Sequence, residues 1–246
     1  MTEVADDLFF VRGMSSNWVI IGGSDTATLI DTGYPGDAEL LDASVEAAGF
    51  KTCDVSSILV THAHADHIGS AERYRREFGT RILALDTEVG HLKREFLEQV
   101  SPKTALPHLI KPRFARWMHM AVRKGHGLDD VTVAQAAAVP AEQPLPFPGA
   151  PIAIPTPGHT RGHAAYWFAE ARILVSGDAL ITGHETSKRT GPQMLHTVFH
   201  HDEPGALRSL ARFAGLDARL VLPGHGDVWS GDLTVAVNRM SEGVAA

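Results

Sequence analysis

The sequence predicts an α/β protein in which a β-sheet is layered against helices. In the first half of the chain, short strand patterns alternate with helical patterns, as in layered α/β folds. The length of 246 residues and the hydrophobic content of 44% are ordinary for a folded domain with a full core. We therefore expect a single domain over residues 1–246, with a helical insertion at about 87–150.

Short β-rich runs dominate the beginning of the chain, and each ends at glycine or polar turn residues. The run at 18–21, for example, stops at Gly22 and Gly23, which is typical of strands and hairpins. Helical spacing of apolar residues follows at 37–49 and again at 69–78. Strands are expected at residues 8–11, 18–21, 27–30, 57–60 and 81–84.

Strand patterns return after a middle segment of different character. Residues 87–138 are mostly helical in pattern, and the proline-rich segment 140–151 is expected to be a loop. Helices are expected again at 203–214 and 233–240. The later strands are expected at residues 152–154, 164–168, 172–175 and 219–222.

Composition and charge exclude several classes of function. The 22 Lys+Arg and 29 Asp+Glu give a net charge of −7, which argues against nucleic-acid binding because phosphates need a basic surface. Cys53 is the only cysteine in the sequence, so an intramolecular disulfide and a thiolate metal cluster are excluded. The chain has no apolar run of transmembrane length, and its acidic start lacks the features of a signal peptide. We expect a cytoplasmic protein that acts on a small molecule, without a nucleic-acid or membrane partner.

The chain has 14 histidines, and several of them are organised around one loop. Directly after the strand expected at 57–60 come His62, His64, Asp66 and His67. The last two would enter the first turn of a helix, which carries them alongside the first two. Nitrogen and oxygen ligands of this kind suit zinc, and also iron or manganese. A charged surface loop is the plainer alternative, but this many potential ligands after a buried strand favour a site for two metals.

Three later strands end in a similar way. Each is followed by a loop that contains glycine and one potential ligand: His159, Asp178 or His225. Glycine allows the backbone to approach closely at such positions. These residues can join the histidine loop only if all the strand ends lie at one edge of the fold.

In their order along the chain, these motifs resemble the five motifs of the metallo-β-lactamase superfamily, from about residue 8 to about residue 230. The resemblance implies a four-layer αββα metallo-β-lactamase sandwich with a helical insertion, in which the metals lie at one edge between the two sheets. The residues that carry it are Asp31, His62, His64, Asp66, His67, His159, Asp178 and His225.

The resemblance also implies a role for each residue. The implied ligands are His62, His64 and His159 for the first metal, Asp66, His67 and His225 for the second, and Asp178 as the bridge. The cofactors would be two divalent metal ions, with zinc favoured and iron or manganese as alternatives. Asp66 and Asp178 would be catalytic. Asp31 would orient a ligand or the histidine loop, and His163 would have an orienting or structural role.

The expected activity is hydrolysis of an ester, thioester or lactone bond in a small substrate, which is anionic in one interpretation. Two metals that share a water lower its pKa, and the bridging hydroxide can attack the carbonyl. The sequence around His159 resembles glyoxalase II, but the short segment after His225 leaves no room for the helical substrate domain of that enzyme. Asp178 argues against a true β-lactamase. Quorum-quenching lactonases have a tyrosine after the fourth motif, but this chain has no tyrosine between Asp178 and His225.

Two other classes of function remain as alternatives. An iron-dependent oxidoreductase similar to persulfide dioxygenases uses the same fold, but such enzymes bind one iron and need few of the second-site ligands. A non-catalytic binding protein would usually have lost ligands. The complete ligand set favours the hydrolase over both.

The insertion contains an amphipathic helix with apolar residues at helical spacing. Lys or Arg occupies positions 103, 111, 113, 116, 123 and 124, with no acidic residue between 101 and 128. The helix is expected to cap the metal cleft. Its basic groups either steer an anionic substrate or form only a solvated face, and a homodimer contact is a third interpretation of its aromatic residues. The apolar stripe comprises Phe114, Trp117, Met118, Ala121 and Val122, and the expected substrate contacts are Phe114, Trp117, Met118 and His184.

Overall fold

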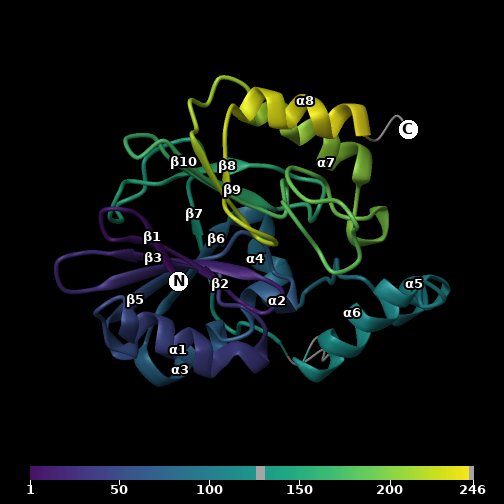
Figure 1. Cartoon of the computed structure of the whole chain (residues 1–246). Helices are drawn as coiled ribbons and strands as arrows, with labels where there is room; N and C mark the ends of the chain where they lie inside the picture. Colours follow the sequence, from purple (N-terminus) through teal and green to yellow (C-terminus); the bar gives the residue numbers. More distant parts are fainter. Residues whose placement is uncertain (126–130, 244–246) are drawn as a thin grey trace.

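Within residues 1–125 and 131–243, which the computed structural model describes, the strands form two β-sheets packed face to face (Figure 1). In the first sheet the order is β1-β2-β3-β4-β5-β6-β7, so its strands follow one another in sequence. Their bounds are Thr2–Ala5, Leu8–Arg12, Asn17–Gly22, Ala27–Ile30, Val55–Leu59, Arg81–Leu85 and Ala137–Val139. The strands β1 to β4 pair antiparallel, and β4 to β7 pair parallel.

The second sheet has the order β12-β11-β10-β9-β8. Its strands, β8 to β12, are Ile152–Pro155, Ala164–Phe168, Ile173–Gly177, Leu220–Pro223 and Trp229–Ser230. Pairing is antiparallel except between β10 and β11, which run parallel. Both sheets therefore contain a parallel pair, β4–β5 in one and β10–β11 in the other.

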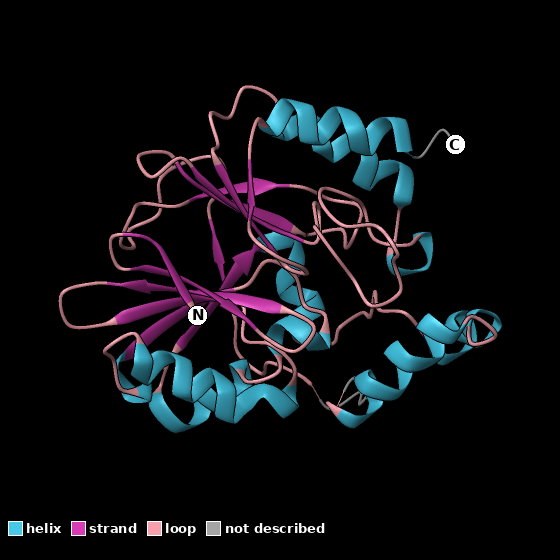
Figure 2. Cartoon of the chain, viewed as in Figure 1, coloured by secondary structure: helices cyan, strands magenta, loops and turns pink. Residues whose placement is uncertain are grey.

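Helices cover the outer faces of both sheets, as Figure 2 shows. The helices α1 to α8 are Ala38–Ala47, Ala65–Ile68, Ala71–Phe78, Asp86–Leu92, Pro102–Ala105, Pro112–Arg123, Glu203–Ser209 and Leu233–Gly243. Short 3₁₀ turns lie at Pro35–Asp37, Thr52–Asp54, Leu106–His108, Thr197–Phe199 and Leu210–Phe213. In Figure 1, α1 and α3 lie against the first sheet and α7 and α8 against the second, while α5 and α6 extend to one side. No helix in this described part of the chain is both long and apolar enough to cross a membrane.

Alternating side chains of single strands divide the core into layers, because successive residues of a strand point to opposite faces. In β3, Val19 and Ile21 belong to the core between the sheets, whereas Ile20 packs in the core that includes the α1 and α3 side chains. In β9, Phe168 lies between the sheets and Trp167 faces the core that includes α8. The layer order is helix, sheet, sheet, helix, which confirms the predicted α/β sandwich.

Several elements differ from the sequence-based expectation. The strand β7 lies inside the segment expected to be mostly helical, and it gains its hydrogen bonds from β6 rather than from a strong strand pattern of its own. The edge strands β1 and β12 were not predicted, since both are short and half-polar. The helix expected at 203–214 ends at Ser209 and continues as the 3₁₀ turn Leu210–Phe213.

The parallel pairs β4–β5 and β10–β11 end at the same edge of the sandwich, and hydrogen bonds join the sheets there. The side-chain amide of Asn17, on β3, donates to the carbonyls of Pro223 and Gly226, 2.9 Å away in each case. From the second sheet, the Tyr166 hydroxyl donates to the Val60 carbonyl (3.0 Å). This edge carries the loops that contain the predicted metal ligands.

Candidate metal centre

The histidine loop begins where β5 ends and is almost completely buried. His62 and His64 lie on the extended stretch before α2, and Asp66 and His67 lie in its first turn. Their exposed fractions are 0% for His62 and His67 and 7% for His64 and Asp66. The predicted entry of Asp66 and His67 into a helix is confirmed, although this helix is the short α2 and not the start of α3.

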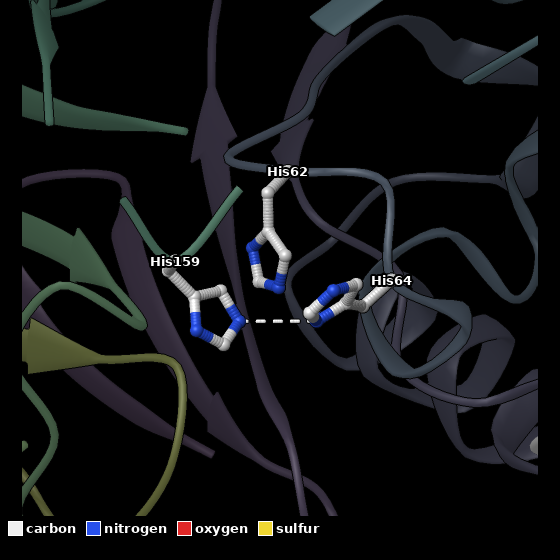
Figure 3. A group of neighbouring side chains, drawn as sticks. All are labelled: His62, His64 and His159. Carbon is white, nitrogen blue, oxygen red and sulfur yellow. Dashed lines mark hydrogen bonds between the residues drawn. The ribbon is translucent and has the colours of Figure 1, made fainter. Parts of the chain in front are cut away.

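Among the described residues, three groups of side chains place their ligand atoms within 4.8 Å of one another. The groups are His62, His64 and His159; Asp66, His67 and His225; and His62, His67 and Asp178. Figure 3 shows the first group, in which Nε2 of His159 lies 3.0 Å from Nδ1 of His64. The first two groups have the same members as the two predicted ligand sets, and the third joins Asp178 to one histidine from each.

Asp178 follows β10 and faces ligands of both sets. Its Oδ1 lies 3.5 Å from Nε2 of His67. Its Oδ2 lies 3.2 Å from Nε2 of His225 and 3.4 Å from Nε2 of His159. Glycine is required at position 224, since a Cβ there would collide with Oδ1 of Asp178. A carboxylate in this position can contact two ions at once.

Each ligand histidine is held by a hydrogen-bonding contact at its other ring nitrogen, which fixes the ring in metal sites. The contacts are His62 Nδ1 to Thr61 Oγ1 (3.0 Å), His64 Nε2 to the Glu98 carbonyl (2.5 Å), His67 Nδ1 to Asp31 Oδ2 (2.8 Å), His159 Nδ1 to His200 Nδ1 (3.3 Å) and His225 Nδ1 to the Ser15 carbonyl (2.8 Å). Nε2 of His62, Nε2 of His67 and Oδ1 of Asp178 are buried without a hydrogen-bond partner among the described residues. Buried, convergent and unpaired ligand atoms fit a divalent cation.

Asp31 holds the histidine loop in place rather than joining a ligand group. It has a φ of 63°, in the left-handed region, where a non-glycine residue is strained. Its carboxylate accepts hydrogen bonds from the Thr61 amide (2.8 Å), the Thr61 hydroxyl (2.7 Å) and Nδ1 of His67 (2.8 Å). These contacts match the orienting role expected for Asp31.

His163 holds Asp178 from the other side. Its Nε2 accepts a hydrogen bond from the Asp178 amide (3.0 Å). Its Nδ1 lies 2.7 Å from the Thr156 hydroxyl, which fixes the ring. His163 therefore sets the position of the Asp178 backbone, one residue beyond the end of β10.

Sequence reasoning missed a buried glutamate that joins the loops of the first ligand group. Oε1 of Glu88, at the start of α4, accepts from the Ala63 amide (2.7 Å) and from Nδ1 of His91 (2.8 Å). Its Oε2 accepts from the Thr160 hydroxyl (2.9 Å) and the Gly162 amide (3.1 Å). The available signal was a carboxylate soon after β6, the strand next to β5.

Burial and neighbouring charges divide the histidines into two classes. Burial, followed by the nearby imidazoles, lowers the pKa of His62 well below its usual value. Burial alone would also lower the pKa of His67 and His225, but Asp178 and the other carboxylates outweigh it and raise them to about 9 and about 10. Burial opposes ionisation of Asp178, but His225 and His67 hold its pKa well below the usual range. The site therefore attracts positive charge.

The metal-free protein is expected to be most stable near pH 6.5. The raised pKa values of His67 and His225 add stability below 6.5, which is lost as pH rises towards 9 and 10. Burial lowers the pKa of His64 and His163 to about 3, so stability is also lost as pH falls below 6.5. Melting temperatures of chelator-treated protein across this range would measure the effect. A melting temperature that does not change with pH would contradict it, and bound metal should remove the loss at high pH because it replaces those protons.

The cavity above the ligands is lined in part by residues of the insertion and of the 183–199 segment. It has a volume of about 20 Å³ and is lined by His64, Asp66, Gln99, Val100, Trp117, His159, Asp178, His184, Leu195, Phe199 and His225. Of the expected substrate contacts, Trp117 and His184 line this cavity. Phe114 instead stacks on Phe199 (5.8 Å between ring centroids), and Met118 packs behind the lining in the same apolar cluster. Val122 is 62% exposed, so its predicted place in the buried stripe is wrong.

The basic residues of the insertion do not line this cavity. Lys124 donates to Asp37 (2.7 Å) and to the Gly36 carbonyl, which ties the end of α6 to the body of the protein. Arg113 donates to the Ser187 carbonyl (2.9 Å). The other four are exposed. These contacts tie α6 to the rest of the protein, where its Trp117 lines the cavity, and leave most of its charge in solvent.

Comparison with known proteins agrees with this geometry. The model of the metallo-beta-lactamase superfamily matches residues 11–225. The Bacillus subtilis (strain 168) protein named "Probable metallo-hydrolase YflN" is 30% identical over 227 residues, which cover 87% of this chain and 82% of that protein. A hydroxyacylglutathione hydrolase of Ectopseudomonas mendocina (strain ymp) is 28% identical. The matched region covers 74% of this chain and 50% of that enzyme. A metallo-beta-lactamase family protein from Thermus thermophilus has the same fold, with a TM-score of 0.69 and 20% identity over 99% of this chain and 81% of its own. The chain therefore belongs to the metallo-beta-lactamase superfamily.

Proposed function

We propose that the protein is a dinuclear metal-dependent hydrolase that cleaves an ester, thioester or lactone bond of a small anionic substrate. One observation carries the proposal. Two complete groups of ligand atoms converge at one edge of the sandwich, and Asp178 faces members of both. When bound there, two divalent ions, with zinc favoured by the nitrogen and oxygen ligands, would activate a water and polarise the carbonyl of the substrate.

Two carboxylates of the chain have separate tasks in this reaction. Asp178, 2% exposed, stays ionised beside His67 and His225 and holds positive charge in the site. Asp66 is more accessible and lines the cavity, with Oδ2 3.5 Å from Nε2 of His225. Asp66 is therefore placed to orient the attacking water and accept its proton. No serine or cysteine nucleophile is required.

Names of related proteins support an ester-like or thioester bond as the bond that is cleaved in the substrate. The Ectopseudomonas relative is named a hydroxyacylglutathione hydrolase, and an acylglutathione is a thioester. The YflN relative is named only as a metallo-hydrolase. Esters, thioesters and lactones share a carbonyl that hydroxide attacks directly, so a panel of all three defines the activity.

An iron-dependent oxidation of the persulfide dioxygenase kind is the alternative. A mononuclear iron centre would need few of the ligands of the second group. The second group of Asp66, His67 and His225 would then have no task, although all three are buried and two of them are oriented by hydrogen bonds. The buried second group favours the hydrolase.

Metal reconstitution is expected to give about two ions per chain, because each ligand group supplies a complete site. Elemental analysis after reconstitution with zinc, manganese or iron(II), followed by assay of ester, thioester and lactone hydrolysis, tests the proposal. One tightly held iron that does not change on reconstitution, together with oxygen consumption on a persulfide, would show the oxidoreductase instead.

A further inference from the structure

The cavity above the ligands is too small for an organic substrate. Its volume of about 20 Å³ holds about one water. Its lining includes Trp117 of α6, His184, Leu195 and Phe199. A substrate that reaches the ligands must therefore extend past one of these side chains into a larger space.

A larger cavity lies directly beside it. This second cavity has a volume of about 460 Å³, which is within the usual range for small-molecule sites. It is lined mainly by the 181–197 segment, and His184 and Leu195 line both cavities. These two side chains thus form a wall between the ligands and a space of substrate size.

The second cavity has an apolar floor and a basic rim. Ile181, Met194, Leu195 and Met240 supply apolar surface. Lys188 and Arg189 are exposed at the rim, and neither forms an ion pair with a described residue. Glu203 is the single acidic residue among its described lining residues. Arg113 adds a third cation at this rim, because it donates to the carbonyl of Ser187.

The segment that carries the two rim cations is held in a fixed conformation. The side chain of Gln193 is buried and donates to the carbonyls of Arg189 (2.9 Å) and Gly191 (3.1 Å). It accepts from the Ser187 hydroxyl (2.6 Å). Backbone hydrogen bonds also join Gln193 to Ile181 in both directions. The rim is therefore preorganised, which reduces the entropic cost of binding a ligand.

We propose that the second cavity binds the non-reacting end of the substrate, an aliphatic acyl chain that ends in a carboxylate. The carboxylate pairs with Lys188 and Arg189, the chain lies on the apolar floor, and the reacting carbonyl reaches Asp66 and Asp178 past His184 and Leu195. This inference rests on the proposed hydrolysis and specifies its substrate class.

A third cavity near β12 fits such a substrate less well. It has a volume of about 350 Å³ and shares His184 with the metal site, but not Leu195. Arg12 at its edge is already paired with Asp227 (2.5 Å), and Glu185 adds negative charge. An anionic chain would therefore be repelled there and attracted to the basic rim.

The test compares two nitrophenyl esters with acyl chains of equal length, the monoester of adipic acid and the ester of hexanoic acid, on metal-loaded protein. We expect the double variant Lys188→Ala/Arg189→Ala to lower kcat/KM about tenfold for the adipate ester, mainly through KM, and to change hexanoate hydrolysis little. The loss should shrink with added salt. Lys51→Ala/Arg76→Ala removes two exposed cations that line neither cavity and should change neither rate.

Equal losses on both esters, or no loss on either, would overturn the proposal. If the wild-type protein hydrolyses neither ester and no thioester or lactone of the panel, the proposed hydrolysis fails, and calorimetric titration with adipate then tests the cavity by itself. Weaker adipate binding by the double variant than by the Lys51 and Arg76 control would support the cavity, and equal binding would overturn it.

The wall residue Leu195 gives a second arm. Leu195→Trp adds bulk between the two cavities without removing a metal ligand. We expect kcat/KM to fall for both esters while the metal content stays unchanged. Unchanged kinetics would show that the substrate does not pass this wall and would overturn the proposed route.

Discussion

Replacing Asp178 with alanine is expected to lower kcat/KM by more than about a hundredfold, because even residues that only support a ligand cost about 10–100-fold when they are changed. Asp178 is 2% exposed and faces His67, His159 and His225. Its removal leaves these histidines crowded around a site that has lost one of its two carboxylates, with Asp66 remaining. The metal content should fall towards one ion per chain or fewer, as measured by elemental analysis after dialysis.

His163→Ala is the matched control for that experiment. His163 contacts the backbone amide of Asp178 (3.0 Å) but offers no atom to a ligand group. We expect it to retain more metal than Asp178→Ala and to lose less activity. If Asp178→Ala retained about two ions and near-normal activity, Asp178 would not be the shared ligand.

Glu88→Gln is expected to weaken binding at the first ligand group about 10–100-fold. Three of the four hydrogen bonds to Glu88 join the loop of His62 and His64 to the loop of His159, and the fourth holds His91 of the same helix. The glutamine side chain has an NH₂ group in place of one carboxylate oxygen of Glu88. At least one of the four buried donors therefore loses its acceptor. The free energy of unfolding should fall by about 1–3 kcal/mol, the cost of an unsatisfied buried group.

Competition with a chromophoric chelator measures the metal affinity of this variant, and denaturant unfolding of metal-free protein measures its stability. Glu77→Gln is the control, because Glu77 is exposed and its one ion pair within the described residues is a 3.6 Å contact with Arg73. A loss of stability with unchanged metal affinity would mean that Glu88 supports the fold alone and does not position the ligands.

The residues of the candidate metal centre could be singled out from the sequence because they lie in short motifs directly after apolar strands. His62, His64, Asp66 and His67 lie within six consecutive residues, so their proximity follows from local geometry. The convergence of Asp178 with this loop depended on the family resemblance, since the sequence alone does not show that β5 and β10 end at one edge. The contacts of Asp31 and His163 fit the orienting roles expected for them.

Other features depend on long-range packing and could not be predicted. Glu88 looks like an ordinary helical acid, and its burial is decided by the loops that fold over it. The strand β7 has a weak pattern and exists because β6 offers an edge. The exposure of Val122 also follows from packing, because α6 meets the protein through Phe114, Trp117 and Ala121 and leaves its last turn in solvent.

We propose that the chain holds two metals in ligand groups that share Asp178. Anomalous diffraction from crystals of zinc-loaded protein, recorded on both sides of the zinc absorption edge, tests it most directly. Two anomalous peaks are expected, one among His62, His64 and His159 and one among Asp66, His67 and His225, with Asp178 in contact with both. A single peak within the first group at saturating zinc, with the second group empty, would contradict it.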